Sequence, residues 1–163
     1  LNLIIKYITM KKLGNILWHF PLFGFITSLY TFLIGSFFVL TVIGAPIGLG
    51  LIQHSKFLLA PFTNQMISDS KLGKDKTILW KILSIVATII YLPFGIIAFL
   101  LTLFQIVLLC LTIIGIPIAV ILAKSLSTYL NPVNKICVKS SVVEELNKRE
   151  AIKKVNNLIN RTD

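Results

Sequence analysis

Few residues in this 163-residue chain have the types and spacing that chemistry requires. The polar side chains Ser28, Thr31, Thr102 and Gln105 stand inside long apolar runs, where they could line a path for an ion or a small solute. The hydroxyl groups among them could equally donate to carbonyls one helical turn earlier, a bond that needs no cargo. We therefore favour helix packing as their role and keep the path as the alternative.

The sequence lacks the patterns of a catalytic or metal site. Neither His19 nor His54 has a Cys, Asp or Glu at ligand spacing, and paired carboxylates occur only at Glu144 and Glu145. No nucleophile elbow, metalloprotease motif or P-loop occurs. We predict no catalytic residue, no metal site and no cofactor, and we expect that the protein is not an enzyme.

Two apolar runs must position these side chains. Residues 13–55 and 82–123 contain no Asp, Glu, Lys or Arg, and each run exceeds the roughly 20 residues that cross a bilayer as a helix. The whole chain is 56% apolar and 13% charged, with a mean hydropathy of +0.89, which is outside the usual range of soluble domains. The sequence therefore predicts an integral membrane protein.

Each run is too long for one crossing, because forty helical residues measure about 60 Å against a hydrocarbon core of about 30 Å. The natural breaks are Gly44-x-Pro46 and Gly115-x-Pro117, since Gly permits a positive φ and Pro suits the first turn of a new helix. The predicted fold is all-α: two tandem helical hairpins with about four membrane segments. The outgoing helices are expected near 22–42 and 94–113, and the returning ones, short enough to be re-entrant, near 46–59 and 117–130.

The two runs resemble each other at a constant offset. Residues 18–62 placed over 89–133 match at fourteen positions, among them Thr41 with Thr112 and Pro61 with Pro132. A tandem duplication is the simplest explanation. We expect a first repeat at 13–63, a basic linker at 64–81, a second repeat at 82–134 and a basic tail at 135–163.

The flanks of the hairpins carry their own patterns. Residues 13–20 and 78–92 are apolar, hold Trp18, Trp80 and Tyr91, and suit lead-in helices at the headgroup level. Pro21 and Pro93 would mark the bend into the membrane, and one kinked helix through each proline is the alternative. The tail at 142–159 predicts a cytoplasmic surface helix. Lys11 and Lys12 follow Met10, which is expected to be the natural start.

Small residues indicate where helices pack. Gly24, Ser28, Thr31 and Gly35 share one face of the first outgoing helix, and such a face lets two helices approach closely in lipid. At the start of each returning helix, the small-xxx-small spacing recurs with Gly48 and Ala119. We assign these six residues to helix packing.

The cations predict the orientation. Lys and Arg gather before, between and after the two runs and are missing at both Gly-x-Pro turns, so both termini and the linker are expected in the cytoplasm. Lys56 and Lys124 lie near the inner interface, where their side chains can reach the headgroups. The net charge of +10 fits this orientation and attraction to anionic lipid better than nucleic-acid binding, for which no motif occurs.

Three segments together resemble the YccF-like inner-membrane component family: 13–18 (LGNILW), 60–62 (APF) and 111–117 (LTIIGIP), the last followed by Lys124 and Pro132. The resemblance covers residues 13 to 133, although Gln53 stands where the first copy would carry the lysine. It implies two copies of a small membrane domain and a bacterial inner-membrane location. The family has no settled biochemical activity to carry over.

We expect a non-enzymatic, multi-pass inner-membrane protein that self-associates and acts as a component or scaffold. The alternative is an oligomeric channel or small transporter with the Ser/Thr/Gln-lined path described above. A third reading is membrane shaping by wedge-like hairpins, in which neither Gly-x-Pro turn reaches the outer face.

Overall fold

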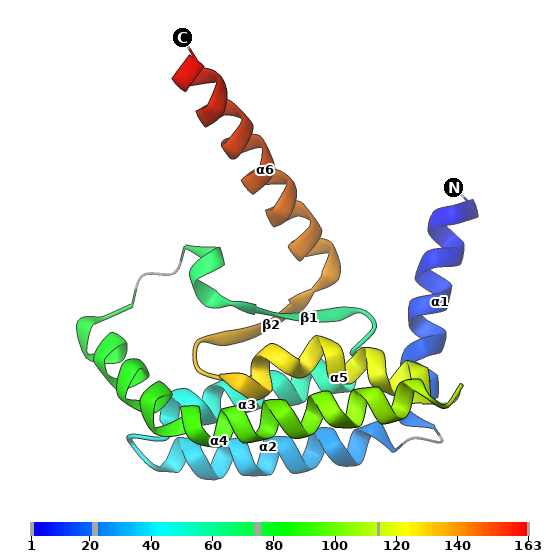
Figure 1. The fold of residues 1–163 in the computed structure, drawn as a ribbon, viewed down its shortest axis with the longest axis horizontal. Coiled ribbons are helices and arrows are strands. Elements are labelled where there is room, and N and C mark those ends of the chain that lie inside the picture. Colours follow the sequence, from blue (N-terminus) through cyan, green and yellow to red (C-terminus); the bar gives the residue numbers. More distant parts are fainter. Residues whose placement is uncertain (1, 21–22, 74–75, 114, 163) are drawn as a thin grey trace.

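The structure, a computed structural model, describes residues 2–20, 23–73, 76–113 and 115–162. The chain is mostly helical, and two helical hairpins form its main layer (Figure 1). The elements follow in the order α1 Asn2–His19, α2 Gly24–Leu40, α3 Ala45–Leu59, β1 Asn64–Ser68, η1 Asp69–Leu72, α4 Ile78–Cys110, α5 Gly115–Leu130, β2 Lys135–Lys139 and α6 Ser140–Thr162.

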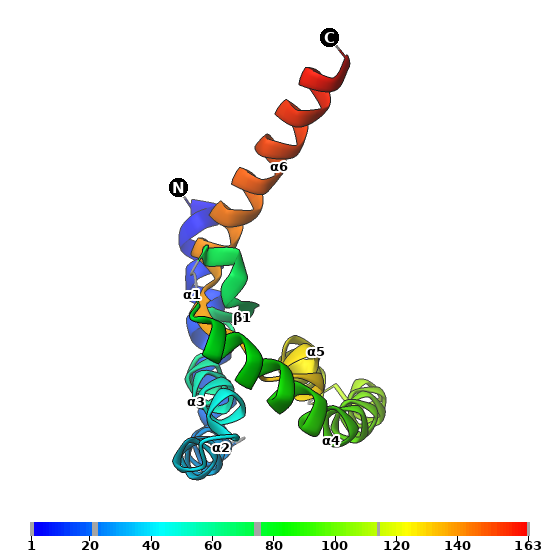
Figure 2. The same cartoon turned by 90° about the vertical axis from the view of Figure 1, so that its left-hand side faces the viewer.

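Each hairpin contains one helix near the paired strands β1 and β2, which form a two-stranded ribbon, and one helix farther from them. The helices α2 and α3 pack antiparallel, and so do α4 and α5, while α3 also contacts α4 and α5. Seen along the helices, the two hairpins diverge, so α2 and α4 lie on the outer sides (Figure 2). The α2–α3 turn and the α4–α5 turn lie at opposite ends of the layer (Figure 1).

The helix α4 has 33 residues, contains Pro93 and changes direction along its length (Figure 1). By length and composition, it is the one described helix that is long and apolar enough to cross a membrane. A second candidate span exists if α1 and α2, which meet at 75°, are counted together as one broken span. At Pro93 the structure therefore has the alternative arrangement, one helix that continues through the proline. The integral, four-segment arrangement stays a prediction.

The expectation of an all-α fold is wrong in one respect. The strands β1 and β2 pair antiparallel, with Asn64 opposite Lys139 and Ser68 opposite Lys135. These strands come from the segments that the sequence analysis treated as basic linker and tail. Because each strand has only five residues and alternates weakly, neither is recognisable before its partner is known.

The core lies between this β1–β2 ribbon and the helices α3 and α5. One cluster contains Trp18, Phe57, Leu58 and Ile121, with Met66 and Cys137 of the ribbon packed against it. A second cluster joins Ile47, Ala87 and Val133. Trp18 is only 6% exposed, so its side chain belongs to this core, and the interfacial position of its helix stays a prediction.

Many large apolar side chains are exposed on the outer helices α2 and α4 and beside the two turns. The most exposed of them include Leu40 at 84% and Ile113 at 88%. The helices α1 and α6, the ribbon and η1 all lie on the other side of the helical layer (Figure 1). The side of α2 and α4 is therefore strongly apolar, whereas the other side also includes exposed apolar residues of α1 and α6.

Candidate functional site

The two hairpin turns have the same hydrogen bonds. Thr41 Oγ1 donates to Phe38 O at 2.8 Å and accepts from Gly44 N at 3.2 Å. Thr112 Oγ1 donates to Leu109 O at 3.1 Å and accepts from Gly115 N at 3.0 Å. Each threonine hydroxyl thus links the last turn of one helix to the start of the next, beside the backbone bonds from Thr41 N to Phe38 O and from Thr112 N to Leu109 O.

The glycines at these turns serve close approach, not an unusual backbone. Gly44 has φ −79°, an ordinary right-handed value, so the expected need for a positive φ is wrong there. A Cβ on Gly44 would lie 2.3 Å from Thr41 Oγ1, and one on Gly115 would lie 2.4 Å from Thr112 Oγ1. Pro46 stands in the first turn of α3, which a proline tolerates.

The predicted packing residues are distributed over different contacts. Gly35 and Gly48 meet where α2 crosses α3, because a Cβ on Gly48 would lie 2.5 Å from Gly35 O. Gly24 instead faces Trp18, whose Nε1 would be 2.1 Å from a Cβ there. Ser28 and Ala119 are buried, whereas Thr31 is partly buried.

The four possible path-lining residues do not come together. Ser28 Oγ donates to Ser55 O across the α2–α3 contact at 2.8 Å. Thr31 and Thr102 each donate to a carbonyl four residues earlier in their own helix, at 2.7 Å. Gln105 is exposed on α4, on the other hairpin from Ser28 and Thr31.

The inner-interface cations differ from each other. Lys56 is exposed, whereas Lys124 is partly buried and donates from Nζ to Pro61 O at 3.1 Å. The Lys124 ammonium also lies 5.7 Å from the ring centroid of Phe62. At the position of the first run that corresponds to Lys124, Gln53 Oε1 accepts from Cys137 N at 3.3 Å, so it binds the ribbon.

His54 is a core residue. It is 1% exposed, stacks on Phe57 with 5.7 Å between ring centroids, and meets Tyr129 edge-on at 5.2 Å. Among the described residues, no three His, Cys, Asp or Glu side chains gather as metal ligands would. Both cysteines, Cys110 and Cys137, are free thiols.

The contacts of the ribbon were missed by the sequence analysis. Asp69 N donates to Asn134 O at 3.0 Å at one end of the ribbon, and Ser140 N donates to Thr63 O at 2.9 Å at the other. Trp18 Nε1 donates to Leu58 O at 2.8 Å, and Tyr91 Oη donates to Tyr129 O at 3.2 Å. The acceptors Leu58 and Tyr129 lie 71 positions apart, as do Thr63 and Asn134, but neither pair is identical, so residue matching at this offset did not mark them.

Comparison with known proteins gives one result. No curated protein and no solved structure matches the chain. Residues 13–64 match the family model of YccF, the inner membrane component domain. These residues comprise the end of α1, both helices of the first hairpin and the start of β1. The match supports the expected family and an inner-membrane location for this protein, whose biochemical role the family does not define.

Proposed function

We propose that the protein is a non-enzymatic structural component of the inner membrane that enters the bilayer from one side and self-associates there. In this arrangement the four hairpin helices lie along the membrane plane. The ribbon lies at the headgroups, and α1 and α6 extend toward the cytoplasm. The proposal takes the wedge-like reading of the hairpins in preference to four full crossings.

The positions of the charged residues are the main support for one-sided insertion. Apart from Lys56 and Lys124, every charged residue that the structure describes lies in α1, in the ribbon, in α6, or between η1 and the first turn of α4. The two exceptions also lie near the ribbon: Lys124 reaches Pro61 O, and the charge of Lys56 opposes the desolvation that raises the pKa of the Cys137 thiol. The apolar side chains of α2 and α4 are thus left for lipid.

Four full crossings would place the β1–β2 ribbon at an energetically unfavourable depth in the membrane. The ribbon runs alongside α3 (Figure 1), so helices parallel to the membrane normal would carry it to hydrocarbon depth. The outer edges of a two-stranded ribbon have unpaired backbone groups, and Lys135 and Lys139 are charged, which makes that depth costly. Two helices stacked about 10 Å apart are instead about 20 Å deep, close to the thickness of one leaflet.

A duplicated hairpin domain is part of the proposal. The paired contacts of Trp18 and Tyr91, of Thr41 and Thr112, and of Asp69 and Ser140 support it, because each partner recurs near or at the same offset. The ribbon would then be the joint between two copies of one unit, in the way that a symmetric dimer joins two identical surfaces.

Self-association follows from the diverging hairpins. The outer faces of α2 and α4 expose aromatic and aliphatic side chains, and a second copy would cover part of them. We expect an oligomer in mild detergent, measured by light scattering across a range of protein concentrations. A monomer at every concentration would remove this part of the proposal.

Cysteine accessibility at the turns tests the insertion. Ile43→Cys and Ile113→Cys, both at exposed positions, are placed in a chain whose own cysteines are serine, and intact cells are treated with a membrane-impermeant thiol reagent. Ser141→Cys at the exposed start of α6 is the control for the cytoplasmic side. One-sided insertion predicts that both turns are protected in cells and in inverted vesicles, whereas Ser141→Cys reacts in inverted vesicles only. Labelling of either turn from outside would contradict one-sided insertion.

A further inference from the structure

The two ends of the ribbon have equivalent backbone contacts but different charges. Asp69 and Ser140 each donate a backbone N–H across the ribbon, to Asn134 O and Thr63 O. Ser140 lies 71 positions after Asp69, and Asn134 lies 71 positions after Thr63. Ser140 therefore takes the place that Asp69 has at the other end, and a hydroxyl group replaces a carboxylate.

The Asp69 end balances its cation within the chain. Lys76 Nζ lies 2.5 Å from Asp69 Oδ2, and the two side chains are 19% and 13% exposed. Lys76 also donates to Asn134 Oδ1. A partly buried ammonium group is thus paired with a carboxylate and a carbonyl oxygen, as such a group requires.

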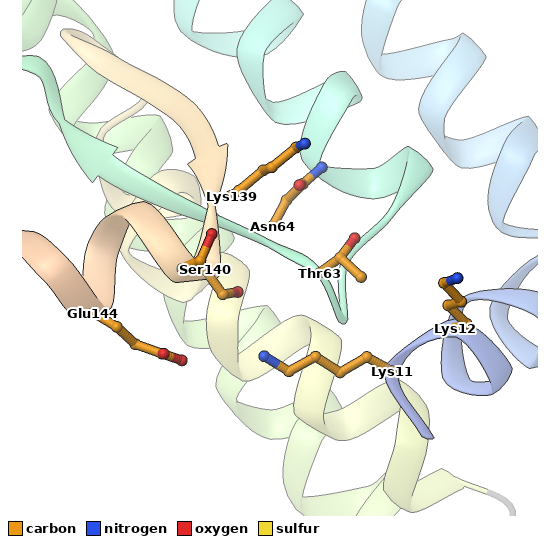
Figure 3. A pocket seen from close by; sticks show the side chains of 8 residues that line it. Lys11, Lys12, Thr63, Asn64, Lys139, Ser140 and Glu144 are labelled. Atoms are coloured by element: carbon orange, nitrogen blue, oxygen red, sulfur yellow. The ribbon is translucent and has the colours of Figure 1, made fainter. Parts of the chain in front are cut away.

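The Ser140 end gathers cations around a cavity instead. A cavity of about 420 Å³ lies between α1, the ribbon and the start of α6. Figure 3 shows Lys11 extending from α1 toward Ser140 and Glu144, with Lys139 and Asn64 on the ribbon. The cavity is lined by Lys11, Lys12, Thr63, Asn64, Lys139, Ser140, Ser141 and Glu144. The lining thus contains three lysines and one glutamate, an excess of two positive charges.

The same cavity offers neutral donors. Ser140 and Ser141 have hydroxyl groups and Asn64 has an amide, whereas the Thr63 hydroxyl already donates to Ala60 O at 3.1 Å. Ser140 and Ser141 also begin the 23-residue helix α6; the Ser140 N–H donates to Thr63 O, and the N–H groups that follow it have no partner within the helix and carry partial positive charge. Cations, hydroxyl groups and helix N–H groups together are the donors that bind a phosphate group.

We propose that this cavity binds the phosphate group of an anionic phospholipid such as phosphatidylglycerol. Lys11, Lys12 and Lys139 supply the positive charge, and the ligand takes the role that the Asp69 carboxylate has at the other end. The choice of a lipid over a soluble phosphate rests on the one-sided insertion proposed above. Lys11 and Lys12 directly precede the exposed apolar residues Leu13 and Ile16 of α1, which places the cavity at headgroup level in that arrangement.

The test uses the full chain in a non-ionic detergent. Short-chain phosphatidylglycerol, short-chain phosphatidylcholine and inorganic phosphate are titrated separately, and binding is measured by thermal unfolding and by native mass spectrometry. We expect phosphatidylglycerol to bind and to raise Tm, and the other two to have little effect at the same concentration. Equal binding of both lipids, or equal binding of inorganic phosphate, would overturn the assignment.

Two sets of variants locate the site. The triple variant Lys11→Gln, Lys12→Gln, Lys139→Gln should lose at least about tenfold in affinity for phosphatidylglycerol, because each lysine near an anionic surface contributes about 1 kcal/mol. The control Lys148→Gln, Lys153→Gln, Lys154→Gln removes the same charge from the exposed part of α6 and should bind as the wild type does. Equal losses in both triple variants would mean that net charge alone attracts the lipid, and the site would fail.

The most specific test is the variant Ser140→Asp. It places at the Ser140 end of the ribbon a carboxylate like the one that Asp69 supplies at the opposite end. We expect a folded protein with about tenfold weaker phosphatidylglycerol binding, because the cations then have an anion within the chain. Wild-type binding by Ser140→Asp would overturn the proposal. The binding assay is performed in detergent, so its outcome is independent of the turn-labelling test. The binding results can reject the lipid site without rejecting one-sided insertion. The labelling results can likewise reject one-sided insertion without rejecting the site.

Discussion

Met66 and Cys137 face each other at the centre of the β1–β2 ribbon, and they lie 71 positions apart in the chain. This separation equals the offset at which the two apolar runs match. In an antiparallel pair, equivalent residues of two copies can face each other only at a two-fold axis. The pairing of Met66 with Cys137 therefore marks an axis that relates the two halves of the ribbon and exchanges Asp69 with Ser140.

This pairing predicts a specific disulfide. Cys137 N donates to the side chain of Gln53, so Met66 and Cys137 behave as a non-hydrogen-bonded pair, the kind whose Cα atoms lie closer, at about 4.5 Å. Met66→Cys in a Cys110→Ser background should form a disulfide with Cys137 on mild oxidation, detected by mass spectrometry after digestion. Gln65→Cys is the control, since Gln65 faces Val138. Equal cross-linking at both positions would contradict the register.

The contact between Gly35 and Gly48 should not tolerate a larger side chain. Gly48→Val introduces carbon atoms where only 2.5 Å separates a Cβ from Gly35 O, so α2 and α3 must move apart. We expect a loss of about 1–3 kcal/mol in the free energy of unfolding, the usual effect of overpacking. Unfolding in mixed detergent micelles measures it. Leu49→Val, at the adjacent exposed position, should change stability by much less.

The threonines at the turns should stabilise the hairpins. Thr112→Val keeps the shape of the side chain but removes the bonds to Leu109 O and Gly115 N, and we expect a loss of about 1 kcal/mol. Thr41→Val should behave the same way. Thr31→Val is the matched control, because the Thr31 hydroxyl bonds within the middle of its own helix and not at a turn. The assigned role would fail if all three variants had the stability of the wild type.

Burial should slow the reaction of the Cys137 thiol with alkylating reagents. Desolvation raises the pKa of its thiol to about 11, against the opposing effect of the Lys56 charge. The thiolate is the reactive form, so at pH 8 its population should be about 100-fold lower in the folded chain than in the unfolded chain. Alkylation by iodoacetamide, followed in a Cys110→Ser background, should be slow at pH 8 and accelerate up to about pH 11.

The same shift has a consequence for stability. The folded state keeps its proton to a higher pH than the unfolded state does, so this contribution is complete below about pH 9 and is lost as the pH rises toward about 11. Lys56→Gln removes the neighbouring positive charge and should slow alkylation further. Faster alkylation in Lys56→Gln than in the wild type would contradict this account.

The sequence determined the local features of this protein. The apolar runs, the Gly-x-Pro breaks and the tail pattern place α2, α3, α5 and α6 within a few residues of their observed bounds. Local properties suffice there, because helix periodicity and helix-breaking residues act over a few positions. The offset of 71 likewise located Thr41 and Thr112, although their hydrogen bonds required coordinates.

The tertiary structure alone decided how the hairpins are arranged. Strands β1 and β2 are weak signals in the sequence, 66 residues lie between Ser68 and Lys135, and their pairing and their packing on α3 stabilise both. That pairing sets the turns at opposite ends of the layer, buries Trp18 and His54, and brings Lys11, Lys12 and Lys139 around one cavity. Contacts between residues so distant in the chain depend on long-range packing, which residue types and spacing do not encode locally.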